Sequence, residues 1–259
     1  MSVAESGVVV TGAGAGIGEA LARRLAAGGA RVVVNDIDEL AAHRIAQDIG
    51  AIAIPGDAAT EAGVASLISE ATHALGEIDV YFANAGVETG GGLFATEDDW
   101  ARTFEVNVMA HVRAARILVP RWLERGHGRF VVTASAAGLL TMLGSATYSV
   151  SKHASLSFAE WLSVTYGHRG VVVQAICPLG VRTQMLELED EIVREILSHD
   201  EAIEPAEVAE SVWAALQGES FLILPHPKVA DYYRSRATNT DHWISGMRKL
   251  QRRIDESAG

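Results

Sequence analysis

Short apolar runs alternate with amphipathic stretches along almost the whole chain. The apolar runs are rich in β-branched residues, as expected for strands that are buried on both faces of a parallel sheet. They cover residues 8–10, 31–35, 51–57, 78–82, 128–133, 171–176 and 221–224. The stretches between them, including 19–25, 61–75 and 97–124, carry apolar side chains at helical spacing. This alternation predicts an α/β fold, a doubly wound seven-stranded parallel sheet with right-handed crossovers and helices on both faces.

No linker or repeat divides the 259 residues, a length that suits one large α/β domain better than two small ones. We therefore expect a single domain over residues 1–259. Two segments are expected to add to the minimal fold, a substrate lid at 184–204 and a C-terminal extension at 226–259. In an open parallel sheet, ligands bind at the carboxyl ends of the strands, so the site is expected in the loops that follow them.

The composition fits a protein with a large buried core, because 49% of the residues are hydrophobic and 21% are charged. The formal net charge of −12 opposes binding to nucleic-acid phosphates or anionic membrane surfaces. The single cysteine, Cys177, excludes an intrachain disulfide, and no apolar run is long enough to span a membrane. The nine histidines show no metal-ligand spacing. We expect a cytoplasmic protein without a metal site and without nucleic-acid or membrane partners.

A glycine-rich turn follows the first predicted strand and leads into the first predicted helix. Residues 11–18 have the sequence TGAGAGIG, in which Gly12, Gly16 and Gly18 remove side chains from the turn. Backbone N–H groups there and the positive end of the helix can hold a pyrophosphate, provided that no Cβ atom blocks its approach. The order of strand, turn and helix predicts a dinucleotide site, although tight packing alone could also account for the glycines.

The second predicted strand ends at Asp36. A carboxylate at this position can accept hydrogen bonds from both hydroxyls of an adenosine ribose, and it repels a 2′-phosphate. The neighbouring Asn35 offers no cation to such a phosphate. We therefore expect NAD rather than NADP as the cofactor. The alternative is that Asp36 only caps the helix that begins near Glu39.

Candidate chemistry lies after the fifth predicted strand. Tyr148 and Lys152 stand at positions i and i+4, so on a helix they share one face. A free phenol is a poor acid–base catalyst near neutrality, but a cation held within a few ångströms favours the phenolate and lowers its pKa. Ser135 adds a neutral donor that can hold a substrate oxygen beside the phenol. Taken alone the spacing is weak evidence, because an exposed lysine and a half-buried tyrosine occur together on many helices.

Taken together, these motifs resemble the short-chain dehydrogenase/reductase family over roughly residues 6–225. The resemblance rests on TGAGAGIG, Asp36 at a strand end, Asp57 in GDAAT, ANAG at 83–86, Asn107, Ser135, Tyr148 and Lys152, in family order and at family spacing. It implies a Rossmann sheet of seven strands. It also implies a dimer or a homotetramer, formed through the helices that follow Ser135 and surround Asn107.

The resemblance implies roles for individual residues. Tyr148 is expected to be the general acid in reduction and the general base in oxidation, while Lys152 lowers its pKa and binds the nicotinamide ribose. Ser135 is expected to orient the substrate oxygen, and Asn107 to hold a water that links Lys152 to solvent. Besides Tyr148 and Lys152, the expected cofactor contacts are Gly12, Gly16, Ile17, Gly18, Asp36, Asp57, Ala58, Asn84, Ala85, Gly86, Pro178, Gly180, Val181 and Thr183.

Two asparagines among these residues have alternative interpretations. Asn84 can be a strand-end turn residue, whereas Asn107 lies between two valines, where an unpaired amide is costly and a bound partner is expected.

One segment departs from the family pattern. After the sixth strand the family usually has Pro-Gly, but this chain has Leu179 after Pro178. Because leucine avoids positive φ, the loop is expected to take a different path past the nicotinamide. Cys177 is expected to be a buried thiol.

The substrate side is expected to be apolar. Two sets of residues can enclose a ligand, namely Met185, Leu186, Leu188, Ile192 and Ile196 from the lid, and Leu139, Leu140, Met142 and Leu143 from the segment before Tyr148. Ordinary core packing explains either set almost as well. The expected substrate is a moderately bulky, apolar secondary alcohol or ketone.

Two other functions compete with this prediction. A β-ketoacyl-acyl carrier protein reductase is disfavoured because Asp36 discourages NADP and the negative net charge gives no attraction for an acidic carrier protein. A non-catalytic NAD-binding sensor is disfavoured because binding alone requires no proton donor such as Tyr148.

Overall fold

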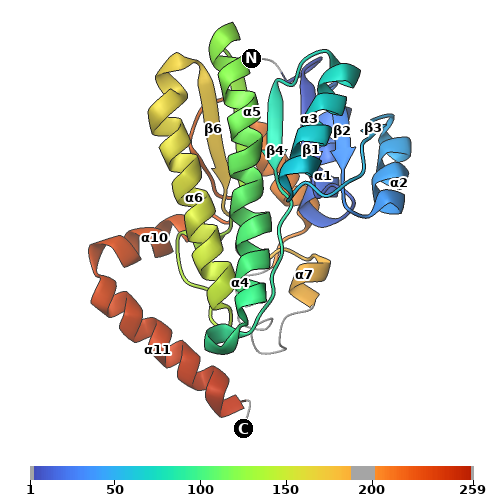
Figure 1. The fold of residues 1–259 in the computed structure, drawn as a ribbon. Coiled ribbons are helices and arrows are strands. Elements are labelled where there is room, and N and C mark those ends of the chain that lie inside the picture. Colours follow the sequence, from blue (N-terminus) through green and yellow to red (C-terminus); the bar gives the residue numbers. More distant parts are fainter. Residues whose placement is uncertain (1–2, 188–201, 258–259) are drawn as a thin grey trace.

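The valine-rich runs form the central strands of a parallel sheet in the computed structural model, which describes residues 3–187 and 202–257. The strand order is β3-β2-β1-β4-β5-β6-β7, and every neighbouring pair is parallel (Figure 1). The strands are β1 (Gly7–Thr11), β2 (Arg31–Asn35), β3 (Ile52–Ala53), β4 (Val80–Ala83), β5 (Gly128–Thr133), β6 (Val171–Ile176) and β7 (Leu222–Ile223). The order switches direction between β1 and β4, which is where an open sheet of this kind binds ligands.

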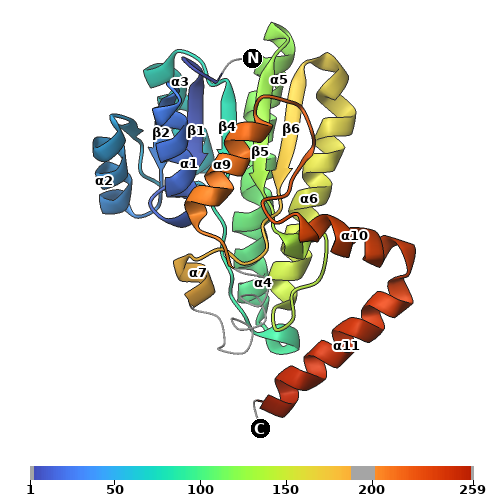
Figure 2. The same ribbon diagram turned by 180° about the vertical axis from the view of Figure 1, so that it is seen from behind.

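Helices cover both faces of the sheet because successive strand residues point to opposite sides. Val8 and Val10 of β1 belong to one buried cluster and Val9 to another. One face is covered by α1 (Gly16–Ala27), α2 (Glu39–Ile49) and α9 (Pro205–Ala215), and the other by α3 (Glu61–Leu75), α5 (Ala110–Arg125) and α6 (Ala146–Tyr166) (Figures 1 and 2). The predicted doubly wound α/β fold is confirmed.

Polar residues begin several of the helices. Asp38, Thr60 and Ser145 each accept a hydrogen bond from the first turn of α2, α3 and α6 respectively. In contrast, α1 begins at Gly16 after Ala15, which supplies no side-chain cap. Among the described residues, the shorter helical segments include three 3₁₀ turns at Gly92–Phe94, Ala136–Gly138 and Gly167–Arg169, and the single turn α7 (Gln184–Glu187).

Two predicted elements differ most from the observed ones, while several other strand and helix ends shift by one to three residues. The helix predicted over 97–124 is two helices, α4 (Glu97–Phe104) and α5, joined by a π-helical turn at Glu105–Met109. Such turns are rare and often occur at functional sites. The strand predicted over 51–57 is reduced to Ile52–Ala53, and beyond it the Asn35 amide donates to the carbonyls of Ile54 and Gly56.

The C-terminal extension is helical. Helices α10 (Lys228–Thr238) and α11 (Thr240–Ser257) follow β7, and α11 points away from the sheet in both views (Figures 1 and 2). The rings of Tyr232 and Trp243 join the two helices, with centroids 6.5 Å apart. None of the helices in the described ranges has the length and apolar character needed to cross a bilayer.

Candidate active site

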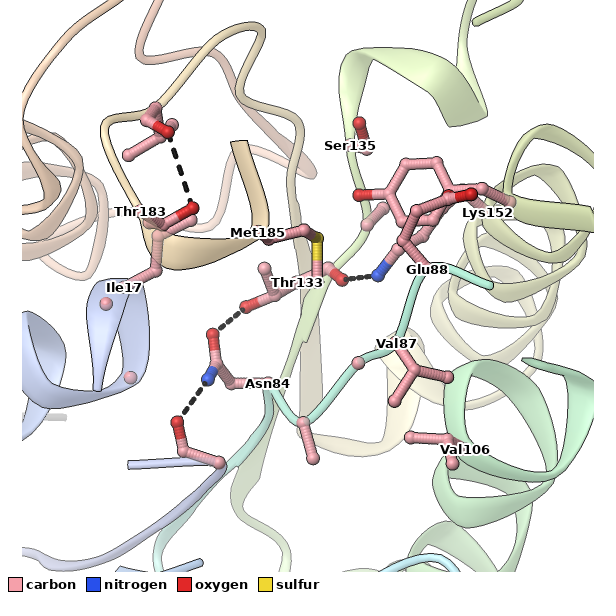
Figure 3. A pocket seen from close by; sticks show the side chains of 18 of the residues that line it. Ile17, Asn84, Val87, Glu88, Val106, Thr133, Ser135, Lys152, Thr183 and Met185 are labelled. Atoms are coloured by element: carbon pink, nitrogen blue, oxygen red, sulfur yellow. Dashed lines mark hydrogen bonds between the residues drawn. The ribbon is translucent and has the colours of Figure 1, made fainter. Parts of the chain in front are cut away.

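A cavity of about 1000 Å³ lies at the carboxyl ends of the strands. Of the four predicted catalytic residues, Ser135, Tyr148 and Lys152 line it, and Asn107 does not. The predicted cofactor residues all line it, namely Gly12, Gly16, Ile17, Gly18, Asp36, Asp57, Ala58, Asn84, Ala85, Gly86, Pro178, Gly180, Val181 and Thr183. Figure 3 shows Ser135 and Lys152 on one side of this cavity and Ile17 and Thr183 on the other.

The glycine-rich turn combines tight packing with an open helix end. Gly12 has a φ of +62°, and a Cβ atom on Gly18 would lie 2.0 Å from the Gly12 carbonyl oxygen, so neither position accepts a side chain. Gly16 and Ile17, at the start of α1, line the cavity, and no side chain caps this helix. Its first N–H groups and the positive end of its dipole therefore suit an anion such as a pyrophosphate.

The Asp36 side chain is bonded to the glycine-rich turn at Gly14. Its carboxylate accepts hydrogen bonds from Gly14 N at 2.8 Å and from Asp38 N at 3.0 Å. The helix from Glu39 is capped by Asp38 rather than by Asp36, so capping does not account for Asp36. The sequence did not point to Arg44, whose guanidinium donates to the Gly14 carbonyl at 3.3 Å. The sequence around Arg44 gives no signal for this contact, because the contact depends on how the glycine-rich turn packs against α2.

Asn84 ties three strand ends together. Its amide nitrogen donates to the carbonyls of Thr11 and Gly12, at 2.9 and 3.2 Å, and its amide oxygen accepts from the Thr133 hydroxyl at 2.9 Å (Figure 3). These bonds join β1, β4 and β5. Asn84 therefore shapes the cavity through its side chain, and it is more than a turn residue.

Tyr148 and Lys152 lie on one face of α6, as their spacing predicts. Ser145 caps the helix by accepting from Tyr148 N at 3.3 Å, which places the tyrosine in the first turn. The Lys152 Nζ atom lies 5.4 Å from the centre of the Tyr148 ring. It also donates to the Thr133 carbonyl at 2.9 Å (Figure 3). The ammonium is therefore held at the end of β5, close to the Tyr148 ring.

The charge on Lys152 is set by opposing effects. Burial lowers the pKa of Lys152 to about 8, while the nearby Glu88 carboxylate acts in the opposite direction. Burial also raises the pKa of Cys177 to about 12, so this thiol stays protonated and is a poor nucleophile. Within the described part of the chain, no group of three or more histidine, cysteine, aspartate or glutamate residues could hold a metal ion.

Ser135 lies at the end of β5, facing the same space. Its Oγ atom accepts from Ala137 N at 3.0 Å, so its hydroxyl hydrogen can be donated to a ligand in the cavity. Ala136 N donates to the Pro178 carbonyl at 2.7 Å. This bond ties the serine loop to the loop that follows β6.

Asn107 lies behind the cavity wall, in the π-helical turn. Its side chain accepts from Val87 N at 2.9 Å and donates to the Val87 carbonyl at 2.9 Å and to the Ser151 hydroxyl at 3.0 Å. The buried amide thus has the partners that its apolar sequence setting requires, and they belong to the protein. It fixes the loop after β4 against α6.

The loop after β6 accommodates leucine without strain. Among the described residues, Glu5 alone has a positive φ without being glycine, so Leu179 lies outside the left-handed region. The Leu179 N–H donates to His226 Nδ1 at 3.1 Å, which anchors the loop to the segment after β7. Pro178, Gly180, Val181 and Thr183 still reach the cavity.

The apolar residues predicted for the substrate side divide between several places. Leu140, Met142, Met185 and Leu186 line the cavity. Leu139 is a core residue with 3% of its surface exposed, and Leu143 lies in a hollow beside α11. Leu188, Ile192 and Ile196 lie outside the described residues.

Two polar residues of the site region did not stand out in the sequence. Glu88 lines the cavity two positions after the ANAG motif, and its place after a strand end was an available signal. His111 is buried on α5, and neither ring nitrogen has a hydrogen-bond partner among the described residues. Burial lowers the pKa of His111 to about 3, with a smaller contribution from the Lys152 charge, so the ring is neutral at physiological pH. Nothing in the sequence distinguished it from a surface histidine.

Comparison with known proteins identifies the family. The family model for short chain dehydrogenases matches residues 6–192. The chain belongs to this family. It is therefore an oxidoreductase, and the resemblance drawn from its motifs is confirmed.

Relatives match over most of the chain. The chain is 38% identical over 236 residues to a 1-deoxy-11-beta-hydroxypentalenate dehydrogenase of Streptomyces avermitilis. This match covers 86% of this chain and 85% of the relative. The chain is 35% identical over 211 residues to a meso-2,3-butanediol dehydrogenase of Serratia marcescens, covering 78% and 83%. A solved short chain dehydrogenase/reductase from Burkholderia phymatum in complex with NAD has 30% identity and a TM-score of 0.84, covering 93% of this chain and 96% of that one.

Proposed function

We propose that this protein is an NAD-dependent oxidoreductase that interconverts a secondary alcohol and a ketone, with Tyr148 as the acid–base group. One observation carries the proposal: Ser135, Tyr148 and Lys152 converge on the same cavity as the glycine-rich turn and Asp36. A protein that only bound a dinucleotide would need the turn but not a phenol beside a buried amine.

The residues divide the work as follows. Ser135 donates a hydrogen bond to the substrate oxygen, and the Tyr148 hydroxyl group takes a proton from it in oxidation or returns one in reduction. The ammonium of Lys152 favours the phenolate form that takes the proton. When bound, the nicotinamide supplies the hydride acceptor or donor. Because the Asn107 side chain is bonded to Val87 and Ser151, we place the expected water on the Asn107 main chain.

The cavity fits a dinucleotide, and we propose NAD rather than NADP. The uncapped start of α1 suits the pyrophosphate, and the Asp36 carboxylate beside Gly14 opposes a 2′-phosphate. The related structure from Burkholderia phymatum contains NAD. Titration of the enzyme with NADH and NADPH, followed by nicotinamide fluorescence, should show NADH binding about tenfold tighter or more. Tighter binding of NADPH would instead point to Arg44 as a phosphate contact.

The substrate is proposed to be a moderately bulky alcohol with a largely apolar body. Leu140, Met142, Met185 and Leu186 give the cavity apolar surface. Two relatives are named as dehydrogenases of a hydroxypentalenate and of a butanediol, which supports oxidation at a hydroxyl-bearing carbon.

Replacement of Tyr148 by phenylalanine tests the central step. Turnover of a panel of secondary alcohols with NAD⁺ should fall about 100- to 10 000-fold, since acid–base catalysis is lost, while NADH binding is largely kept. Tyr166→Phe, at the far end of the same helix, is the matched control and should leave turnover unchanged. Unchanged turnover in Tyr148→Phe would remove the proposed role of Tyr148, whereas NADH binding without turnover of any substrate by the wild type would favour a sensor. A panel that includes β-ketoacyl thioesters separates the proposed alcohol dehydrogenase from the carrier-protein reductase.

We also propose that the enzyme is a homo-oligomer through α6. Trp161 and Val164 on this helix are 54% and 78% exposed, and the rings of Phe158 and Trp161 stack with centroids 6.4 Å apart. Exposed apolar surface of this kind marks an interface. Light scattering of Val164→Asp should show a smaller assembly than the wild type, and an unchanged mass would place the interface elsewhere.

A further inference from the structure

The loop after β4 places a carboxylate in the wall of the cavity. Glu88 lines the cavity together with Ser135 and Tyr148. Its Oε1 atom accepts hydrogen bonds from Gly90 N, at 2.7 Å, and from the Ser145 hydroxyl. Its Oε2 atom is buried and has no hydrogen-bond partner among the described residues. One half of the carboxylate is thus anchored by the protein, and the other half is left without a donor.

The anchoring fixes this carboxylate relative to the proposed acid–base group. Ser145 donates to Glu88 and also accepts from Tyr148 N, so one residue links the Glu88 side chain to the main chain of Tyr148. Glu88 and Lys152 lie on the same side of the cavity (Figure 3), and the carboxylate helps to keep the Lys152 ammonium charged. A donor that meets Glu88 would therefore belong to the same molecule whose carbinol faces Tyr148.

A buried carboxylate oxygen without a donor is costly, and a ligand that supplies one removes this cost. Glu88 lines the cavity and the terminal torsion of a glutamate side chain is broad, so a small rotation of the carboxylate can bring Oε2 to the cavity surface. The pocket therefore offers a strong acceptor at one point of an otherwise apolar substrate wall.

We propose that Glu88 accepts a hydrogen bond from a second hydroxyl group of the substrate, so that the enzyme prefers diols and hydroxyketones to simple alcohols and ketones. This inference rests on the proposed function and specifies its substrate class. The donor is a neutral hydroxyl rather than an ammonium because the buried Lys152 cation beside Glu88 repels a second positive charge. An anionic group is excluded by Glu88 itself.

Matched substrates test the proposal. The values of kcat/KM with NAD⁺ are measured for cyclohexanol, for cis- and trans-1,2-cyclohexanediol, for 1,3-cyclohexanediol and for 2-aminocyclohexanol. In the wild type, at least one diol should exceed cyclohexanol by about tenfold to a hundredfold, the value of a hydrogen bond to a charged acceptor. The gain should lie mostly in KM. Equal values for diol and cyclohexanol would overturn the proposal, and so would a preference for the amino alcohol over every diol.

Glu88→Gln is the decisive variant. Glutamine keeps an oxygen for Gly90 and Ser145 but turns an NH₂ group toward the cavity, where it cannot accept. The diol preference, taken as the ratio of kcat/KM for a diol to kcat/KM for cyclohexanol in the same variant, should fall to about threefold or less, and this ratio is independent of any change that the lost charge makes to Lys152. Glu97→Gln, which removes the same charge from the exposed first turn of α4, should keep the preference. A diol preference that survives in Glu88→Gln would show that Glu88 is only a loop anchor.

A binding measurement separates this inference from the proposed function. The melting temperature of the NADH-loaded protein is measured with each diol and with cyclohexanol. A diol-specific rise in melting temperature in the wild type that is lost in Glu88→Gln would support the inference. If the wild type showed this rise but oxidised no alcohol, the lack of oxidation would count against the proposed function alone. Equal shifts with diol and cyclohexanol would overturn the inference whatever the turnover.

Discussion

The two walls of the cavity are built in opposite ways. The wall formed by β1 and α1 depends on missing side chains, since a Cβ atom at Gly18 would fall 2.0 Å from a carbonyl oxygen. The wall formed by the end of β5 and by α6 depends on buried polar side chains, with Lys152 in the wall itself and with Asn107 and His111 outside the cavity lining. The first wall brings backbone N–H groups to a ligand. In and around the second wall, the Lys152 ammonium and several side-chain hydrogen bonds are shielded from water.

The comparison shows that the two walls tolerate different changes. In the glycine wall any added atom meets backbone, which cannot move aside. In the polar wall the volume is less critical, but each side chain must keep its partner or its protonation state. Three substitutions test this difference: one in the glycine wall, one at a buried polar residue outside the cavity lining, and one in the loop after β6.

Gly18→Ala should give the largest effect. The added methyl group would meet the Gly12 carbonyl oxygen at 2.0 Å, so the turn and α1 must separate. We expect NADH binding to weaken about a hundredfold and the free energy of unfolding to fall by about 1–3 kcal/mol, the usual cost of overpacking. Fluorescence titration and urea denaturation measure the two quantities.

Gly218→Ala is the matched control, because its Cβ atom would meet only the Ala215 carbonyl oxygen, at the ordinary distance of 3.9 Å. It should change neither quantity. Near-normal NADH binding in Gly18→Ala would mean that the turn is not held by backbone packing.

The fold was predictable because its signals are local. Runs such as 171–176 are apolar on almost every residue, and that pattern alone indicates a strand covered on both faces. The strand at 128–133 and the helix at 61–75 were predicted with their observed bounds. The π-helical turn at Glu105–Met109 was not predictable, because its sequence continues the helical spacing and its shape depends on the bonds that Asn107 makes to Val87 and Ser151.

The candidate site was predictable to a different extent in each wall. The glycine-rich turn can be recognised from its residues alone, and Tyr148 and Lys152 can be recognised from their spacing on one helix. The contact between Lys152 and Thr133, the anchoring of Glu88 by Ser145 and the position of Arg44 beside Gly14 each join residues far apart in sequence. No periodicity records such pairs, so only the folded structure reveals them. The roles assigned to the site residues stay predictions until the variants are measured.

His111→Leu should give an intermediate effect, and only in acid. Burial holds the pKa of His111 at about 3 in the folded protein, below its ordinary value of 6.5. Between these values the unfolded chain takes up a proton that the folded protein does not, so stability falls as the pH drops below 6.5. At pH 5 this histidine should therefore cost the wild type about 2 kcal/mol of unfolding free energy relative to pH 7.5.

In His111→Leu that part of the acid destabilisation should disappear, while stability at pH 7.5 stays close to the wild type. Urea denaturation at pH 5 and pH 7.5 measures it. His43→Leu, at an exposed position on α2, is the control and should keep the wild-type pH dependence. The same pH dependence in His111→Leu and the wild type would show that the buried ring does not limit stability in acid.

Leu179→Gly should give the smallest effect, and it tests whether the family's usual glycine is needed in the loop that closes the cavity. Leu179 lies outside the left-handed region and packs partly buried against the core. Glycine should therefore lower the free energy of unfolding by about 1–2 kcal/mol, through lost burial and added chain entropy, and should change NADH affinity by less than about threefold. A gain in NADH affinity of about tenfold would show that leucine holds the loop away from the cofactor. Cofactor binding at the loop after β6 would then depend on the absence of a side chain, as it does in the glycine wall.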